Sequence, residues 1–315
     1  MVLNQQGQQV FVLDDNPVPE WRSLAKPRPE LVTITGPSGA ELNGLLVPPV
    51  GRIEGQKYPV MTYVYGGPHA QIVRDGWGRL QPFIVFLAQR GIGTFIVDNR
   101  GSGNRDRAFT RAIKNRFGDI EVEDQLVAQA WLKEQPWVDG DHVGVFGWSY
   151  GGYMSLLLIL EEETPFAAAV SVAPVTDWKL YDTHYTERYI GTPQQNGEVY
   201  ERAEVIRRAK GLERPLLVMH GMADDNVLFE HSLALFETLQ GESLPFELMV
   251  YPGRAHGIRG RGTQLHVYRM IWRFFSRELC TELNGGCRVP PAAGPAPADE
   301  KAATAQADTG SAPQG

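Results

Sequence analysis

The residue types and spacing with the clearest chemical meaning in this chain are those of Gly147-Trp148-Ser149-Tyr150-Gly151. The apolar run 142–146 precedes this segment and predicts a buried strand, and 153–160 after it predicts a helix. A strand, a G-x-S-x-G turn and a helix together form a nucleophile elbow, whose tight turn exposes the serine hydroxyl. The following helix points N–H groups toward that hydroxyl, where they favour negative charge. Ser149 is therefore the predicted nucleophile, and an ordinary glycine-rich turn is the alternative.

A serine becomes a nucleophile when a base removes its proton and a third group orients the base. In α/β-hydrolases the acid and then the histidine follow the serine along the chain. Asp224 and Asp225 follow the apolar strand 216–219, and His256 follows the strand 246–251 and a Pro-Gly break. These positions lie beyond the carboxyl ends of strands, where open α/β sheets gather their catalytic groups. Spacing does not separate Asp224 from Asp225, since either also suits a turn or the N-cap of a helix over 227–240.

The remaining histidines do not fit the role of the base. His220 ends a strand but precedes the acid, which is the wrong order for this arrangement. The five others do not follow a strand at the end of the domain, and we interpret them as structural: His69, His142, His184, His231 and His266. His256 is therefore the predicted base.

Alternating strand and helix patterns must position these residues. A hairpin over 31–35 and 41–47 opens the sheet, with the turn Gly36-Pro37-Ser38-Gly39 between its strands. Six further strands are predicted at 60–65, 94–98, 143–146, 168–172, 216–219 and 246–251. Apolar residues at helical spacing predict helices over 122–131 and 264–279. This alternation indicates a mostly parallel eight-stranded sheet with helices on both faces.

The composition fits an enzyme with one large core. Hydrophobic residues make up 43% of the 315 positions, and the net charge of −7 argues against nucleic acid or an anionic membrane as a partner. No apolar run approaches the 18 residues of a membrane helix, and no signal peptide is recognised. No metal or cofactor is expected. For Cys280 and Cys287 two free thiols are expected, with a local disulfide as the alternative, and the compartment stays undecided.

Seven stretches of the chain resemble the catalytic domain of the prolyl oligopeptidase family, and most of all its dipeptidyl peptidase IV branch. They are 63–68, 98–103, 117–125, 147–153, 173–189, 220–227 and 255–257. The combination of G-W-S-Y-G-G with H-G-x-A-D-D-N-V is far more specific than the elbow alone. The resemblance implies an α/β-hydrolase fold, a serine peptidase that cleaves after Pro or Ala, and a triad of Ser149, Asp224 and His256. Peptides would be its substrates.

The oxyanion hole has two interpretations. The residues alone suggest the backbone N–H of Tyr150 with an N–H from the Gly66-Gly67 loop. The resemblance instead implies the hydroxyl of Tyr65 beside the Tyr150 N–H, and a phenol aimed at the developing alkoxide is physically as good a donor as an amide. For Tyr65 the alternative is an aromatic residue packed in the core.

Three aromatic residues, Trp178, Tyr181 and Tyr185, fall at a spacing of three to four residues. On a helix they would share one face, which is typical of a core stripe. The resemblance implies instead a pocket for proline, formed by Val175, Trp178, Tyr181, Tyr185, Tyr150 and Val227. It also places Asn226 with Val227 in the substrate site.

Three segments are predicted: a lead-in over 1–30, a peptidase domain over 31–283, and a disordered Ala/Pro-rich tail over 284–315. The family carries a β-propeller before this domain, for which the chain has no room, so the lead-in is interpreted as a possible remnant of its last strand and linker. In dipeptidyl peptidases that propeller supplies the acidic pair for the substrate's amino terminus. The resemblance also allows a homodimer. A small-substrate esterase or amidase, and a non-catalytic binding module, are the alternative functions.

Overall fold

The computed structural model describes residues 1–15, 18–76, 78, 80–281 and 287. Contacts group Pro27–Pro290 as one compact unit and place Met1–Lys26 outside it. In the first 26 residues two short strands, β1 (Val2–Leu3) and β2 (Gln9–Phe11), pair antiparallel and are followed by the helix α1 (Pro19–Ser23). The predicted domain boundaries at 30 and 283 stay predictions.

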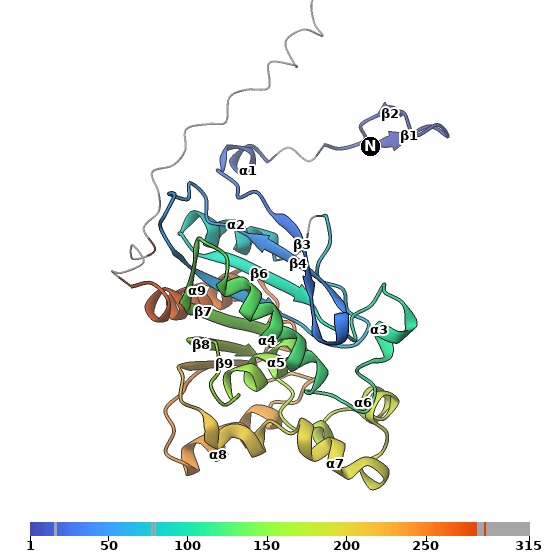
Figure 1. The fold of residues 1–315 in the computed structure, drawn as a ribbon, viewed down its shortest axis with the longest axis vertical. Coiled ribbons are helices and arrows are strands. Elements are labelled where there is room, and N and C mark those ends of the chain that lie inside the picture. Colours follow the sequence, from blue (N-terminus) through green and yellow to red (C-terminus); the bar gives the residue numbers. More distant parts are fainter. Residues whose placement is uncertain (16–17, 77, 79, 282–286, 288–315) are drawn as a thin grey trace, which may run out of the picture. The chain divides into compact units, whose positions relative to one another are not determined.

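The larger unit is built on one eight-stranded sheet, with the strand order β10-β9-β8-β7-β5-β6-β4-β3 (Figure 1). Its strands are β3 (Glu30–Thr35), β4 (Glu41–Val47), β5 (Tyr58–Val64), β6 (Gly93–Asp98), β7 (Val138–Trp148), β8 (Ala168–Val172), β9 (Leu216–Gly221) and β10 (Glu247–Tyr251). The pairs from β10 through β7 to β5 and β6 are parallel, whereas β4 pairs antiparallel with both β3 and β6. The hairpin and the mostly parallel sheet are therefore confirmed.

Helices cover both faces of this sheet. The helices of the unit are α2 (Gln81–Gln89), α3 (Arg107–Arg111), α4 (Ile120–Lys133), α5 (Tyr150–Ile159), α6 (Thr183–Ile190), α7 (Pro193–Ala203), α8 (Glu230–Gly241) and α9 (Arg261–Glu278). Three short 3₁₀ turns add to them: η1 (Pro37–Gly39), η2 (Trp178–Leu180) and η3 (Ile206–Gly211). Apolar side chains of α4, α5 and α8 enter one core cluster, and those of α2 and α9 enter another on the opposite face. The predicted α/β-hydrolase fold is confirmed.

The sequence located every strand of this sheet, and it placed some ends wrongly. β7 begins at Val138 rather than at the predicted residue 143. Its first half contains Asp139, Asp141 and His142, so the sequence shows no apolar run there and the prediction missed the start of the strand. β5 ends at Val64, one residue before the predicted end, so Tyr65 follows the strand. The helix predicted over 227–240 begins at Glu230, with Phe229 at its N-cap, so neither Asp224 nor Asp225 caps it.

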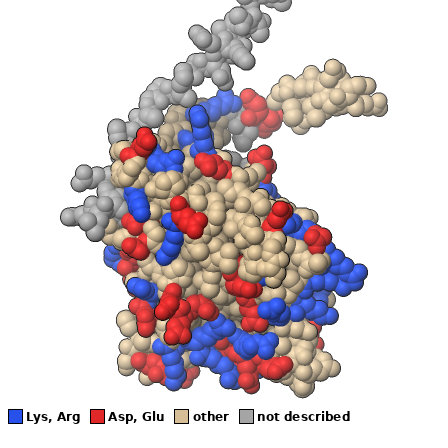
Figure 2. All heavy atoms as spheres, viewed as in Figure 1, with Lys and Arg blue, Asp and Glu red and all other residues tan. Residues whose placement is uncertain are grey.

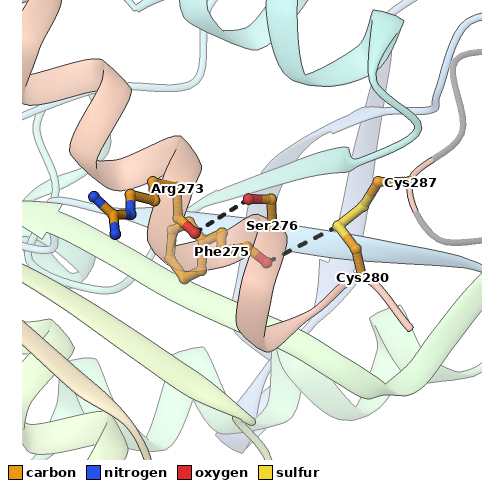
Figure 3. The surroundings of a disulfide bond; sticks show 5 residues. All are labelled: Arg273, Phe275, Ser276, Cys280 and Cys287. Atoms are coloured by element: carbon orange, nitrogen blue, oxygen red, sulfur yellow. Dashed lines mark hydrogen bonds between the residues drawn. A yellow bond between two sulfur atoms is a disulfide. The ribbon is translucent and has the colours of Figure 1, made fainter. Parts of the chain in front are cut away.

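Cys280 and Cys287 form a disulfide, with their Cα atoms 5.2 Å apart (Figure 3). The expectation of two free thiols was therefore wrong. The two residues are only seven positions apart in the sequence, and α9 ends at Glu278, just before Cys280. Apart from Cys287, the predicted tail over 284–315 lies outside the described residues.

Acidic and basic side chains are interspersed on the face of the molecule shown in Figure 2. Among the residues described, no helix has both the length and the apolar character needed to cross a bilayer.

Candidate active site

Ser149 lies in a sharp turn between β7 and α5. Its backbone has φ 63° and ψ −120°, a strained conformation for a residue with a side chain. The flanking glycines leave room for this turn, because a Cβ at Gly147 would collide with the carbonyl oxygen of Gly151, and one at Gly151 with that of Val64. The serine N–H donates to the carbonyl oxygen of Val172 on β8 at 2.8 Å. The elbow geometry expected from the sequence is therefore present.

Asp224 and His256 come together although they are far apart in the sequence. The Nδ1 atom of His256 lies 2.8 Å from Oδ2 of Asp224, so the ring's Nε2 atom is left to face other groups. Asp224 is 5% exposed, whereas the neighbouring Asp225 points to solvent. Of the two candidate acids, only Asp224 contacts the histidine.

Four N–H groups point at the Asp224 carboxylate. Oδ1 accepts from the backbone N–H groups of Asn226 and Val227, each at 3.0 Å, and Oδ2 is near His256 and His220. Burial alone would raise the pKa of Asp224, but the hydrogen bonds from the two histidines and the backbone outweigh it and hold this pKa well below its usual range. Asp224 is therefore a firmly ionised acceptor at neutral pH.

His220, which was excluded as the base because it precedes the acid in the sequence, contacts the acid in the structure. Its Nε2 atom lies 3.1 Å from Oδ2 of Asp224 and 2.9 Å from the carbonyl oxygen of Val227, and its Nδ1 atom lies 2.7 Å from the hydroxyl of Ser232. Two acceptors face Nε2, so this nitrogen carries the proton and donates to the acid. Its position four residues before Asp224, at the end of β9, was the available signal, which the expected residue order overruled.

Backbone contacts tie the acid turn to the histidine loop and to the elbow. The N–H of Ala223 donates to the carbonyl oxygen of Arg254 at 3.0 Å. The indole N–H of Trp148, next to the serine, donates to the carbonyl oxygen of His256 at 3.0 Å. The three loops that carry Ser149, Asp224 and His256 are therefore cross-linked by direct hydrogen bonds as well as by the sheet.

Tyr65 and Tyr150 lie next to each other, with ring centroids 6.2 Å apart. Tyr65 is half-buried, and burial followed by the proximity of Tyr189 raises the pKa of its hydroxyl, which therefore stays protonated and able to donate. Tyr150 is the first residue of α5, where backbone N–H groups have no partner within the helix. Two of the donors considered for an oxyanion hole thus come from the residue after β5 and from the first residue of α5, which follows Ser149 directly.

The aromatic residues predicted for a pocket form one connected wall. Trp178 stacks against Tyr185 with centroids 6.2 Å apart, and Tyr181 packs edge-on against both. The ring of Tyr150 lies 5.4 Å from that of Trp178, so the wall begins beside the serine. Val175 and Val227 are buried in the same core cluster. Asn226 joins this group, because its side-chain oxygen accepts from the Tyr181 hydroxyl at 2.7 Å.

The spacing of these aromatic residues had suggested a single helix, but in the structure they do not lie on one helix. Trp178 is in the 3₁₀ turn η2, Tyr181 follows it in an extended conformation, and Tyr185 is in α6. The rings still meet because the chain turns between them. Phe117, which was given no role, packs edge-on against Tyr150 and lies 4.8 Å from Trp178.

His256 also borders a cavity of about 490 Å³. Trp148, Tyr63, Phe146 and Tyr268 contribute to its lining, and these residues belong to the core on the α2 and α9 face rather than to the aromatic wall. The cavity that His256 borders is therefore not the one that the wall would form. Within the described part of the chain, no three His, Cys, Asp or Glu side chains are arranged to hold a metal ion.

Comparison with known proteins places this geometry in a family. The model of the prolyl oligopeptidase family matches residues 80–281. Dipeptidyl peptidase 8 of Mus musculus is 36% identical over 270 residues, which cover 82% of this chain and 30% of that protein. The probable dipeptidyl peptidase 4 of Neosartorya fischeri is 39% identical over 243 residues, covering 75% of this chain and 32% of the relative.

Solved structures of similar proteins share the fold. The dipeptidyl peptidase 4 of Porphyromonas gingivalis superposes with a TM-score of 0.81 at 31% identity, covering 87% of this chain and 39% of that one. A putative dipeptidyl aminopeptidase IV of Bacteroides ovatus gives a TM-score of 0.78 at 36% identity, covering 81% and 36% of the two chains. This chain spans about a third of the length of the curated relatives it matches. The chain belongs to the prolyl oligopeptidase family. The similar proteins named above are dipeptidyl peptidases or are described as such.

Proposed function

We propose that this member of the prolyl oligopeptidase family is a serine peptidase that cleaves after Pro or Ala, with Ser149 as nucleophile, His256 as base and Asp224 as acid. The observation that carries the proposal is the contact between His256 Nδ1 and Asp224 Oδ2, at 2.8 Å, beside a serine in a strained elbow. Strain of this kind persists where the surrounding structure holds it, and it is concentrated at functional sites. A binding module has no need to keep all three groups.

The reaction follows from which atoms are free. Since Asp224 occupies Nδ1 of His256, Nε2 takes the proton of Ser149 while Oγ attacks the carbonyl carbon of the substrate. The Tyr65 hydroxyl and the Tyr150 N–H donate to the alkoxide that forms. His256 then passes its proton to the leaving nitrogen, the peptide bond breaks, and an acyl-enzyme remains. Water attacks the ester with His256 again as base, which releases the acid product and restores Ser149.

The aromatic wall supports the preference for proline on the acyl side. A pyrrolidine ring is compact and apolar and carries no N–H once it is part of a peptide bond. The flat faces of Tyr150, Trp178, Tyr181 and Tyr185 offer apolar contact to such a ring. We propose that Asn226, whose side-chain oxygen accepts from the Tyr181 hydroxyl, lines the substrate site together with Val227. We further propose 31–283 as the peptidase domain and a homodimer as its assembly.

Fluorophosphonate labelling tests the nucleophile. The wild-type protein should be labelled covalently, and Ser149→Ala should not be, while its circular dichroism stays the same. Ser155→Ala is a matched control, because Ser155 lies buried in α5 and its hydroxyl bonds to the carbonyl oxygen of Gly151. Undiminished labelling of Ser149→Ala would overturn the assignment.

Chromogenic substrates separate the peptidase from the alternatives. A peptidase of the dipeptidyl type should cleave Ala-Pro and Gly-Pro anilides much faster than the matched Leu anilides. A general esterase would hydrolyse p-nitrophenyl acetate but none of the anilides, and a binding module would hydrolyse neither. Comparing free with acetyl-capped Xaa-Pro substrates then asks whether these 315 residues include a group that holds the substrate's amino terminus.

A further inference from the structure

Glu121 is a buried carboxyl group to which the proposed reaction assigns no role. It lies in the first turn of α4 and is 0% exposed. Glutamate is almost never fully buried unless it is paired. Yet among the described residues Glu121 has no ion-pair partner, unlike its neighbours Glu123 and Asp124, which both bind Arg100. Some other contact must account for a carboxyl group at this position.

That contact is with Tyr150. The Tyr150 hydroxyl donates to Oε1 of Glu121 at 2.5 Å, and the N–H of Gly118 donates to the same oxygen at 3.1 Å. The other oxygen, Oε2, is buried without a hydrogen-bond partner in the described part of the chain. Burial raises the pKa of Glu121 to about 7, although the bond from Tyr150 acts in the opposite direction. The site therefore tolerates a costly group, which favours a specific use.

Tyr150 connects the nucleophile to the pocket. Its backbone follows Ser149 directly, and its ring lies 5.4 Å from both Phe117 and Trp178 and 6.2 Å from Tyr65. The start of α5 fixes the near end of this side chain, and Glu121 holds its far end through the hydroxyl. Without the second attachment the ring could tilt about χ1 and χ2, which would change the shape of the pocket while leaving the backbone N–H in place.

We propose that Glu121 is a positioning residue that determines acyl-side specificity, because it holds the Tyr150 ring in the wall of the pocket beside Ser149. This inference rests on the proposed function of that wall as the proline pocket. A purely structural core position would be filled as well or better by an apolar side chain, which has no carboxyl group to desolvate. The hydrogen bond from the Tyr150 hydroxyl explains why a carboxyl group stands at position 121.

The test compares Glu121→Met with Glu121→Gln. Methionine is of similar length but cannot anchor the hydroxyl, whereas the glutamine carbonyl still accepts from it. Glu123→Gln is the matched control, because Glu123 is on the same helix but is largely exposed. For each variant we would measure kcat and KM on Pro and Leu anilides, and the rate of fluorophosphonate labelling, which reports Ser149 without needing the acyl pocket.

We expect Glu121→Met to lower the Pro-over-Leu ratio of kcat/KM about tenfold or more, mainly by raising KM for the Pro substrate. Labelling should stay within about threefold of wild type, and Glu121→Gln and Glu123→Gln should keep the ratio within about threefold. An unchanged ratio in Glu121→Met would overturn the proposal, and so would an equal loss of labelling, which would place the effect at the nucleophile. A wild-type protein that is not labelled at all would instead refute the proposed function.

If Glu121→Met does not fold, Tyr150→Phe removes the other end of the same hydrogen bond by deleting one oxygen. We expect it to lower the Pro-over-Leu ratio about tenfold, as Glu121→Met should, because the ring loses its second attachment. An unchanged ratio in Tyr150→Phe would overturn the proposal.

Discussion

Replacing Asp224 by asparagine should disable the base without disturbing the fold, and the hydrogen bonds of the site explain why. Oδ1 accepts from two backbone N–H groups, those of Asn226 and Val227. These donors cannot reverse, so the amide oxygen of an asparagine must take the Oδ1 position. Its NH₂ group then occupies the Oδ2 position, facing the ring nitrogens of His256 and His220.

This arrangement forces His256 into the wrong tautomer. Its Nδ1 atom must become an acceptor for the amide, so the ring proton moves to Nε2, the atom that has to receive the proton of Ser149. The same substitution in a serine protease triad lowers kcat about 10⁴-fold for this reason. Here His220 also loses its acceptor on residue 224 and can donate only to the carbonyl oxygen of Val227. We therefore expect kcat to fall by at least roughly 10³-fold.

The assay is the steady-state hydrolysis of an Xaa-Pro anilide by wild type, Asp224→Asn and Asp225→Asn, with circular dichroism to verify folding. Asp225 is exposed and adjacent in sequence, so its variant should stay within about threefold of wild type. A loss below about tenfold in Asp224→Asn would refute the tautomer argument. A larger loss in Asp225→Asn would move the role of the acid to that residue.

Three further predictions follow from other parts of the site. Tyr65→Phe should lower kcat by roughly 10²–10³-fold with little change in KM if the hydroxyl donates to the oxyanion, and a loss under about threefold would favour the backbone of the Gly66-Gly67 loop. Tyr181→Ala should reduce the Pro-over-Leu preference by about 10- to 100-fold. Tyr181→Phe loses only the hydrogen bond to Asn226 and should keep most of this preference. Equal effects of the two substitutions would show that the hydroxyl rather than the ring determines the preference. Burial raises the pKa of Glu121 from 4.5 to about 7, so the folded state binds the proton of this carboxyl group more tightly than the unfolded state does. The stabilisation from this proton is complete below pH 4.5 and is lost as the pH rises through about 7. The melting temperatures of wild type and Glu121→Gln should therefore diverge between pH 4.5 and 8, with that of the wild type falling more as the pH rises. Parallel curves would contradict a raised pKa of Glu121.

The sequence by itself determined the sheet and the elbow, because both depend on local patterns. Apolar runs of strand length predicted all eight strands, and β8 was placed at its observed bounds. The elbow was recognisable because a turn this tight excludes side chains at Gly147 and Gly151, which only glycine satisfies. Strand ends were less certain where polar residues interrupt the apolar run, as in the first half of β7.

Local patterns could not separate side chains whose roles depend on distant partners. Asp224 and Asp225 are equivalent as a sequence pair, and only the fold buries one against His256 and exposes the other. The aromatic spacing suggested a single helix, but the wall is assembled from the η2 turn, an extended segment and α6. The two cysteines are a similar case, since their pairing depends on the distance between them in the folded chain.

Tertiary structure alone decided the surroundings of the triad. His220 donates to Asp224 because the end of β9 turns back on itself, and Glu121 holds Tyr150 because α4 and α5 pack on the same face of the sheet. His220 opens the segment H-G-x-A-D-D-N-V and Glu121 lies in the stretch 117–125, but the contacts of both residues depend on burial and on partners that the fold brings near. The pattern of residue types in a segment shows which chemical groups that segment contains. Which of them meet, at what distance and with how much water excluded, is set by packing between elements.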